Sequence, residues 1–331
     1  MYCAYWVLFN YFNNVERIGV AIKMFAVLVV YIFLESLRQK YLWGLYQIYG
    51  PFPHQNSLSM YIAVLGSLYC AMCINYRTSW PKLAIVAIVF AMCSVLELFT
   101  LSRAGMACYG LGIAIIFGIT YLKGLTLRKI IFTVSIATVV LMALAFSMKS
   151  IIRRIEEAPK SSRITRVNLA ISAVNMANSK TLGVGLNNFA LKVNLPYPFS
   201  VHLKKGDYPE NFKEGLVETI YLMIAAESGW TNLVVFLIYL AYFYGVNLLN
   251  IFRFRKRNEQ FIAIGFAGGL ASIYLQSSLE WVLKQSCNFY QLMFVFAVIS
   301  AMAAIYRREK IQARKQERSA IPAVPVAEAE L

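Results

Sequence analysis

The chain has 331 residues, of which 59% are hydrophobic and 15% are charged, and its formal net charge is +16. A mean hydropathy of +0.58 excludes an ordinary soluble globular domain. The apolar runs are continuous rather than alternating, which excludes a transmembrane β-barrel. The composition therefore predicts an all-α, polytopic helical membrane protein.

Eight apolar blocks are long enough to cross about 30 Å of hydrocarbon as helices. Residues 1–12 could form the end of a further helix, and no cleavable signal peptide is expected because no basic segment precedes the first apolar run. The predicted spans are roughly 17–37, 57–76, 83–101, 104–122, 129–148, 230–251, 260–282 and 287–306.

The basic residues of the short connections predict which side of the membrane each connection faces. They fall in alternate connections, and cytoplasmic loops are enriched in Lys and Arg. With eight spans, all of them lie on the cytoplasmic side, and the other connections face outward. These residues are Arg77, Lys82, Lys123, Arg128, Lys129, Arg253, Arg255, Lys256 and Arg257, followed by Arg307, Arg308, Lys310, Arg314, Lys315 and Arg318 in the tail.

Four regions follow from this pattern. We expect N-terminal transmembrane helices at 1–148, a large basic external loop with a re-entrant segment at 149–229, C-terminal transmembrane helices at 230–306, and a basic, partly disordered cytoplasmic tail at 307–331. From Lys149 to Glu214 the loop holds eleven basic and five acidic residues, so we expect it to bind an anionic partner. Long loops escape the charge rule, so this loop does not change the topology.

The six cysteines predict neither a disulfide framework nor a metal site. Cys70 and Cys73 form a Cys-x-x-Cys pair, but no second pair accompanies them. Their span has a lipid-facing context, and we expect them to be small core residues that behave as buried hydrophobes. No metal and no cofactor are predicted.

Two polar clusters mark outward ends of predicted spans. His54 and Asn56 end the segment Gly50-Pro-Phe-Pro-His-Gln-Asn, where a turn with an Asn helix cap is the alternative to a binding role. Ser102 and Arg103 lie in a junction with almost no loop. Arg103 either extends to the interface or presents a fixed guanidinium to a phosphate.

A third cluster lies in the long loop. Arg163 and Arg166 precede apolar residues at helical spacing, which predicts an amphipathic helix that lies on the membrane or covers a cavity. Gly183 and Gly185, followed by Asn187, would end this helix and turn the backbone sharply. They do not indicate a nucleotide-binding fold, because the strand–helix context is absent.

A fourth cluster contains two carboxylates, Glu218 and Glu227, with Tyr221 between them in an apolar segment that re-enters the membrane. Ionisable residues within a membrane are functional-site hypotheses by default. A partly desolvated carboxylate suits a general base. The alternative is that Glu218 pairs structurally with one of the arginines.

Taken in order, these clusters resemble the O-antigen ligase and O-antigen polymerase superfamily of bacterial envelope glycosyltransferases. The resemblance covers roughly residues 40–250. It implies transfer of a glycan from an undecaprenyl-pyrophosphate carrier to a hydroxyl of a lipid, glycan or protein acceptor, outside the bacterial cytoplasmic (inner) membrane, without a metal or a nucleic acid. The matching elements are Phe52-x-His54-x-Asn56, Leu101-Ser-Arg103-x-Gly105, the arginines of the outer loop, Leu182-Gly-Val-Gly185-x-x-x-Phe189 and Glu227-x-Gly229.

The resemblance also implies roles for individual residues in an inverting transfer. Arg103 and Arg166, helped by Arg163, would hold the pyrophosphate. The family has His-Asn where this chain has Glu218-Thr219, so Glu218 is expected to orient or deprotonate the acceptor hydroxyl, with His202 as the alternative base. Relative to the family, the chain is expected to be short at its N-terminus. The expected substrate-binding residues are Arg163, His54, Asn56, Ser102, Asn187 and Tyr221.

Three other functions stay open. A polymerase of the same superfamily would differ from a ligase only in its acceptor. A transporter or flippase of anionic lipid-linked glycans would favour charges in the middle of spans and internal repeats. In this chain the few charged residues within the predicted spans lie mostly near span ends, and no repeat is evident. A structural subunit of an envelope complex is favoured if Glu218 is dispensable. The charged exceptions within spans are Lys23, Glu35, Glu97 and Glu280.

Overall fold

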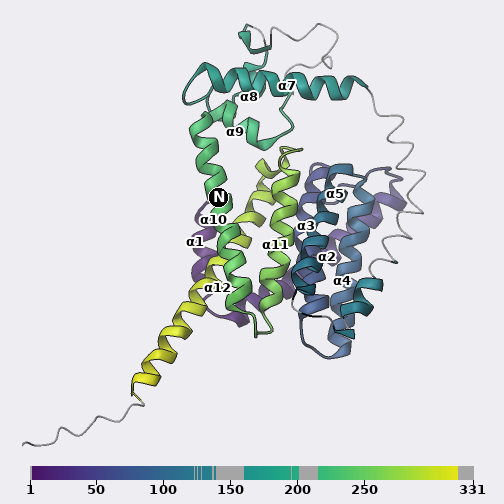
Figure 1. The fold of residues 1–331 in the computed structure, drawn as a ribbon. Helices are drawn as coiled ribbons and strands as arrows, with labels where there is room; N and C mark the ends of the chain where they lie inside the picture. The colour runs from purple at the N-terminus through teal and green to yellow at the C-terminus, as the bar shows by residue number, and fades with distance from the viewer. Residues whose placement is uncertain are drawn as a thin grey trace, which may run out of the picture.

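The computed structural model describes residues 2–122, 160–194, 196–200 and 215–319, together with 124, 126–127, 129–135 and 138. Within these ranges every regular element is a helix. Figure 1 shows a bundle of helices with a separate layer across one end. This upper layer consists of α7 (Lys160–Ser179), α8 (Phe189–Lys192), η2 (Pro198–Ser200) and α9 (Ile220–Ser228).

Six helices of the bundle are long and apolar enough to cross a membrane, which confirms a multi-pass helical protein. A seventh, α11 (Gln260–Gln276), is apolar but shorter, and α1 (Tyr2–Tyr11) confirms a helix at the beginning of the chain. The predicted number of eight is not confirmed, because most of 129–148 lies outside the described residues. The six are α2 (Val15–Leu37) with its π-helical continuation η1 (Arg38–Leu42), α3 (Gln55–Asn75), α4 (Trp80–Thr100), α5 (Arg103–Tyr121), α10 (Trp230–Arg253) and α12 (Ser286–Ser319).

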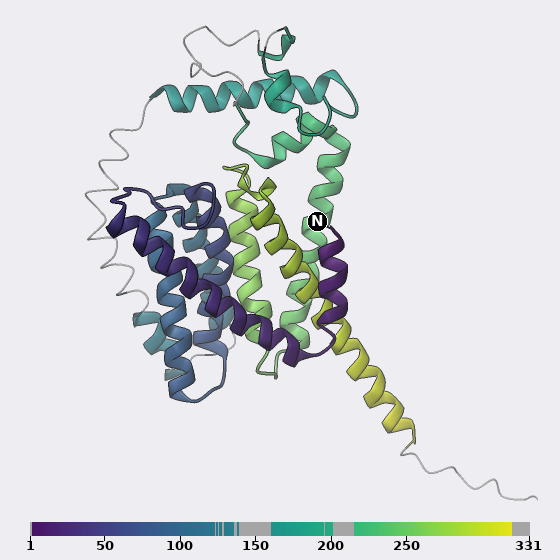
Figure 2. The same cartoon turned by 180° about the vertical axis from the view of Figure 1, so that it is seen from behind.

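Helix α3 lies at the centre of the bundle. It contacts α4, α5, α11 and α12, and Cys70 and Cys73 on it are fully buried. The prediction that these cysteines are small core residues is confirmed. The lipid-facing context expected for their span is wrong, because α3 is surrounded by other helices. Figure 2 shows α2 running obliquely across the back of the bundle, where the Tyr69 hydroxyl donates to the Ile22 carbonyl at 2.7 Å.

The basic connections gather at the end of the bundle opposite the upper layer (Figure 1). The Arg77 backbone N–H donates to Asn258 Oδ1 at 2.6 Å, and Arg257 pairs with Glu309 of α12 at 2.6 Å. These contacts place three basic segments at one end, in agreement with their predicted common side. The basic residues of the predicted tail are helical, because α12 continues to Ser319.

Helices α5 and α11 approach each other through two glycines. A Cβ atom on Gly112 would lie 2.8 Å from the Gly268 carbonyl oxygen, and one on Gly268 would lie 2.5 Å from that of Gly112. Beside them, the Ser272 hydroxyl donates to the Cys108 carbonyl at 2.9 Å. Small residues at such contacts let helix backbones pack closely without a hydrophobic driving force.

Substitution of Gly112 tests this contact. We expect Gly112→Ala to force α5 away from α11 and to destabilise the protein by roughly 1–3 kcal/mol, the usual cost of overpacking. The measurement is the thermal unfolding midpoint of the purified protein in detergent or nanodiscs.

Gly110→Ala is the matched control on the same helix, because a Cβ atom there meets nothing within 4 Å. Equal midpoints for the two variants would show that the α5–α11 contact does not depend on glycine.

Candidate functional site

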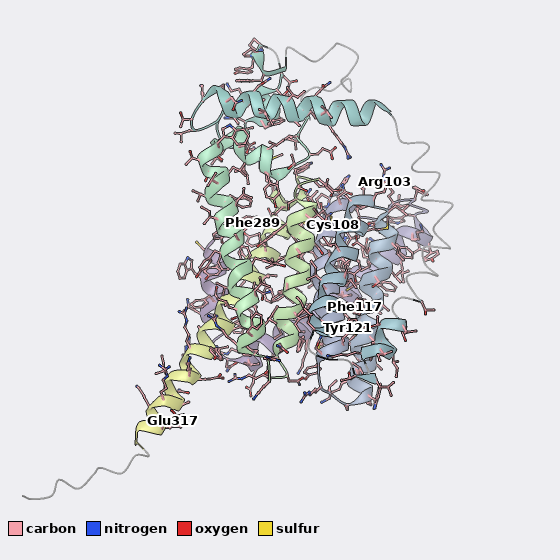
Figure 3. The ribbon with its side chains drawn as sticks, in the orientation of Figure 1. Arg103, Cys108, Phe117, Tyr121, Phe289 and Glu317 are labelled. Atoms are coloured by element: carbon pink, nitrogen blue, oxygen red, sulfur yellow. The ribbon has the colours of Figure 1, made fainter. Side chains whose placement is uncertain are left out.

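The junction between α4 and α5 is a tight reversal of the chain. Leu101 ends α4 with a φ of 51°, and the Ser102 hydroxyl caps α5 by accepting from the Gly105 N–H at 3.2 Å. A Cβ atom on Gly105 would lie 1.8 Å from Ser59 Oγ, so only glycine fits there. Arg103, the first residue of α5, is exposed and lies at the end of α5 nearest the upper layer (Figure 3).

His54 and Asn56 lie at the beginning of α3, at the same end of the bundle. His54 caps α3, and its Nδ1 accepts from the Asn56 N–H at 3.2 Å. The alternative that Asn56 is the cap is therefore wrong. Burial lowers the pKa of His54, so its imidazole is neutral near pH 7. The Asn56 carbonyl accepts from Gln276 Nε2 at 3.4 Å, which links α3 to the end of α11.

Arg166 of α7 forms an ion pair with Glu218, which lies just before α9. Arg166 Nε lies 3.0 Å from Glu218 Oε1, and the side chains are 54% and 36% exposed. The pairing of Glu218 with an arginine, one of the two alternatives from the sequence, is thus present. Because the pair is accessible, both groups can still contact a ligand. The side chain of Arg163, also on α7, and all of His202 lie outside the described residues.

The loop after α7 is held against α9 by its backbone. Val184 N–H donates to the Ala226 carbonyl at 2.9 Å, and Gly185 N–H to that of Glu227 at 3.0 Å. Gly183 and Gly185 have φ values of +67° and +100°, which confirms the predicted sharp turn. Asn187 follows with a φ of 60° and is exposed.

Glu227 and Lys284 form a second ion pair, which the sequence did not predict. Glu227 is 5% exposed, and Lys284 Nζ lies 3.0 Å and 3.1 Å from its two carboxylate oxygens. Lys284 belongs to η4 (Val282–Lys284), far from Glu227 in the sequence, and no local spacing connects them. A buried carboxylate of this kind needs its cation, because an unpaired buried charge is strongly destabilising.

An apolar groove of about 420 Å³ adjoins this ion pair. Phe289, at the beginning of α12, is one of its walls and is labelled in Figure 3. Tyr221 lies nearby on α9, where its hydroxyl donates to the Tyr274 carbonyl at 2.8 Å. The groove is lined by Leu186, Ile220, Met223, Ile224, Glu227, Ser228, Asn232, Val235, Phe236, Tyr239, Leu283, Lys284 and Phe289.

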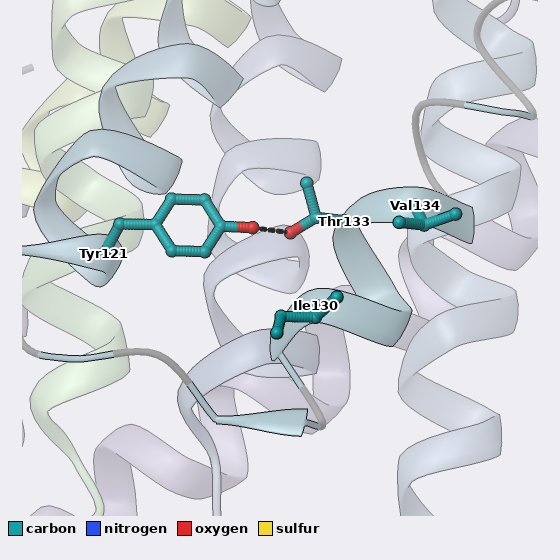
Figure 4. Close-up of a pocket in the computed structure, with 4 residues that line it drawn as sticks. All are labelled: Tyr121, Ile130, Thr133 and Val134. Atoms are coloured by element: carbon teal, nitrogen blue, oxygen red, sulfur yellow. Dashed lines mark hydrogen bonds between the residues drawn. The ribbon is translucent and has the colours of Figure 1, made fainter.

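A second hollow, of about 450 Å³, is drawn in Figure 4, and the described residues that line it carry no charge. Its walls are Tyr121, Ile130, Thr133 and Val134, and the Tyr121 hydroxyl is hydrogen-bonded to that of Thr133. Tyr121 and Arg103 lie at opposite ends of α5 (Figure 3). This hollow is therefore remote from the polar cluster around Arg103.

The predicted site residues gather in two places at the upper end of the bundle. Ser102 and the Arg166–Glu218 pair lie around one buried carboxyl group, that of Glu280, whose pKa they affect. Asn56 joins them through Gln276, which also donates to Glu280 at 3.2 Å. In the second place, Tyr221 and Asn187 directly follow Ile220 and Leu186, which line the groove. Among the described residues, no group of three His, Cys, Asp or Glu side chains is arranged to hold a metal ion.

Comparison with known proteins gives one family. No curated protein matches the chain. The model of the Wzy_C family, described as O-antigen ligase, matches residues 88–237, a range that contains Arg103, Arg166, Glu218 and Glu227. His54, Glu280 and Lys284 lie outside it. The match confirms the resemblance that the order of the motifs predicted: residues 88–237 are similar to the O-antigen ligase-like superfamily.

Proposed function

We propose that this protein transfers a glycan from an undecaprenyl-pyrophosphate carrier to an acceptor hydroxyl on the outer side of the bacterial cytoplasmic membrane. The family implies an enzyme that moves lipid-linked glycans in the manner of an O-antigen ligase or polymerase. One observation carries the proposal for this chain. Two exposed arginines, Arg103 of α5 and Arg166 of α7, occupy the same end of the bundle, where α7 lies across it (Figures 1 and 3).

The arginines suit the leaving group of this reaction. As the bond between the anomeric carbon and the pyrophosphate oxygen breaks, negative charge develops on the pyrophosphate. Guanidinium groups held ready at that position stabilise the transition state, and such electrostatic stabilisation is usually the largest catalytic contribution. Their planar shape also matches two phosphate oxygens at once. We propose that the acceptor displaces the pyrophosphate directly, which makes the transfer inverting, and that the arginines stabilise the leaving group without a metal.

Glu218 would act on the acceptor side of the same site. Its carboxylate holds Arg166 in place at 3.0 Å and is accessible enough to orient or deprotonate an incoming hydroxyl. Asn56 and Ser102 lie beside this position, and we propose that they and His54 contact the sugar. The upper layer would limit the entry of water, which otherwise hydrolyses the donor.

The groove beside α10 would receive the prenyl chain. Its walls are mostly apolar, and Val235 on its rim is 57% exposed on a face of α10 that carries other exposed apolar residues. Lys284, which is paired with Glu227, also belongs to the lining. We propose that Tyr221 and Asn187 contact the donor.

The distribution of charge supports the orientation. The basic connections lie at the end of the bundle opposite the upper layer (Figure 1), and cytoplasmic loops carry an excess of Lys and Arg. The upper layer would therefore face the periplasm, where such a donor and the envelope acceptors meet.

Alanine variants of the two arginines test the proposal. We expect Arg103→Ala and Arg166→Ala each to lower the rate of glycan transfer by at least about 10²–10³-fold, the usual effect of removing one group that stabilises developing negative charge. The measurement is transfer from a purified prenyl-pyrophosphate glycan by the protein in nanodiscs.

Arg38→Ala is the matched control, because Arg38 pairs with Glu35 at the same end of the bundle but outside the site. All three variants should insert in the membrane in equal amounts. Normal transfer by both site variants would contradict the proposal, and donor movement across a vesicle without transfer would identify a transporter instead.

The surface polysaccharide of cells that lack the protein separates a ligase from a polymerase. If the protein is a ligase, we expect long chains to stay on the prenyl carrier and to be missing from lipopolysaccharide. If it is a polymerase, single repeat units should still reach their acceptor. Gel electrophoresis of the extracted glycolipids shows the difference, and an unchanged pattern would contradict both activities.

A further inference from the structure

Glu280 is a buried carboxyl group between the bundle and the upper layer. The apolar run predicted as a span to residue 282 ends earlier, since α11 stops at Gln276 and Glu280 lies in the following turn. The residue is 6% exposed. Its Oε2 accepts from Gln276 Nε2 at 3.2 Å, and the Ser102 side chain lies close enough to lower the pKa of its carboxyl group. Glu280 therefore lies close to the residue that caps α5 directly before Arg103.

A second buried acid lies beneath it. Glu97 of α4 is 2% exposed, accepts from Ser59 Oγ at 2.5 Å, and is close enough for its charge to interact with that of Glu280. Two oxygens of this cluster, Glu97 Oε2 and Gln276 Oε1, are buried without a hydrogen-bond partner. Buried polar atoms without a partner are costly and rare, so their presence here indicates a site that receives a proton or a polar group.

Accessible charges lie on the other side of Glu280. Glu218 and Arg166 of the exposed ion pair both affect its pKa, the carboxylate raising it and the guanidinium lowering it. The largest cause is burial, and together these effects raise the pKa of Glu280 to about 7. The other titratable groups that face it are Glu97 of α4 and Cys108 of α5. A carboxyl with this pKa exchanges its proton at neutral pH, as a general base must.

We propose that Glu280 is the base that removes the proton from the acceptor hydroxyl, in the reaction proposed above, on which this inference rests. The hydroxyl oxygen forms a bond to the anomeric carbon as the bond from that carbon to the pyrophosphate oxygen breaks. The pyrophosphate leaves with the electron pair and is held by Arg103 and Arg166. The hydroxyl proton passes to the Glu280 carboxylate, and Glu218 is then the residue that positions Arg166.

The pH dependence of transfer follows from this assignment. Because the base acts in its deprotonated form, the rate for the wild-type protein should rise with pH through about 7. In Glu280→Gln the side chain keeps its size and can still form hydrogen bonds, but its amide cannot take up the proton. We expect it to lower the transfer rate by about 10²–10⁴-fold, to leave the KM for the donor within about threefold, and to lose the rise with pH.

Glu280→Asp separates catalysis from folding. A shorter carboxylate keeps the chemistry, so we expect partial activity that still rises with pH, at a shifted midpoint. Glu35→Gln is the control for loss of a carboxylate at the same end of the bundle, because Glu35 only pairs with Arg38. Wild-type rate and pH profile in Glu280→Gln would overturn the inference, as would an unchanged profile with a raised KM alone.

Thermal unfolding gives a readout that is independent of transfer. A carboxyl whose pKa is raised in the folded protein binds a proton that the unfolded chain has already released, so stability falls as the pH rises from about 4.5 to about 7. Glu280→Gln should remove this part of the fall and so be at least as stable as the wild type at pH 8. A strongly destabilised Glu280→Gln at pH 8, with Glu280→Asp inactive as well, would show a purely structural residue. Absence of transfer by the wild-type protein itself would contradict the proposed function instead.

Discussion

The close packing of α5 against α3 and α4 at Gly105 determines where the site lies. No side chain fits at Gly105, because Ser59 Oγ and Glu97 Oε1 are 1.8 Å and 2.9 Å from the position of a Cβ atom. The chain therefore reverses without a loop, and Arg103 becomes the first residue of α5. A cation there opposes the positive end of the helix dipole. A bound phosphate would offset that cost, because helix N-termini favour anions.

The upper layer keeps its place through contacts of the backbone with the end of α11. The Ile220 N–H donates to the Ser277 carbonyl at 3.1 Å, and Tyr221 reaches the carbonyl of Tyr274. The end of α9 in turn packs closely against the loop that follows α7. A Cβ atom added at Gly229 would lie 2.0 Å from the Thr181 carbonyl oxygen. Arg166 and Glu280 thus belong to segments whose positions are joined by hydrogen bonds, although they are far apart in the sequence.

The sequence predicts the features that depend on neighbouring residues. The apolar lengths indicate the spans, and the spacing of Gly183 and Gly185 indicates the end of α7. It does not predict pairings between distant segments, so Lys284 as the partner of Glu227 was missed. Glu280 was assigned to a span because the apolar run continues past Gln276, where the helix ends. His54 rather than Asn56 caps α3, since both residue types have suitable acceptors and only the local backbone decides. The catalytic roles of Arg103, Arg166 and Glu218 stay predictions.

Glu218, Glu227 and Glu280, three of the carboxylates at the upper end, differ in what compensates their charge. Glu218 contacts Arg166, and Glu227 contacts Lys284. Glu280 accepts a hydrogen bond from the amide of Gln276, which compensates a negative charge less completely than a cation does. Burial is the main cause that raises its pKa to about 7, and the hydrogen bond offsets this rise only in part. Glutamates at one end of the bundle can therefore pair with an arginine, pair with a lysine or have a pKa of about 7, because their burial and their partners differ.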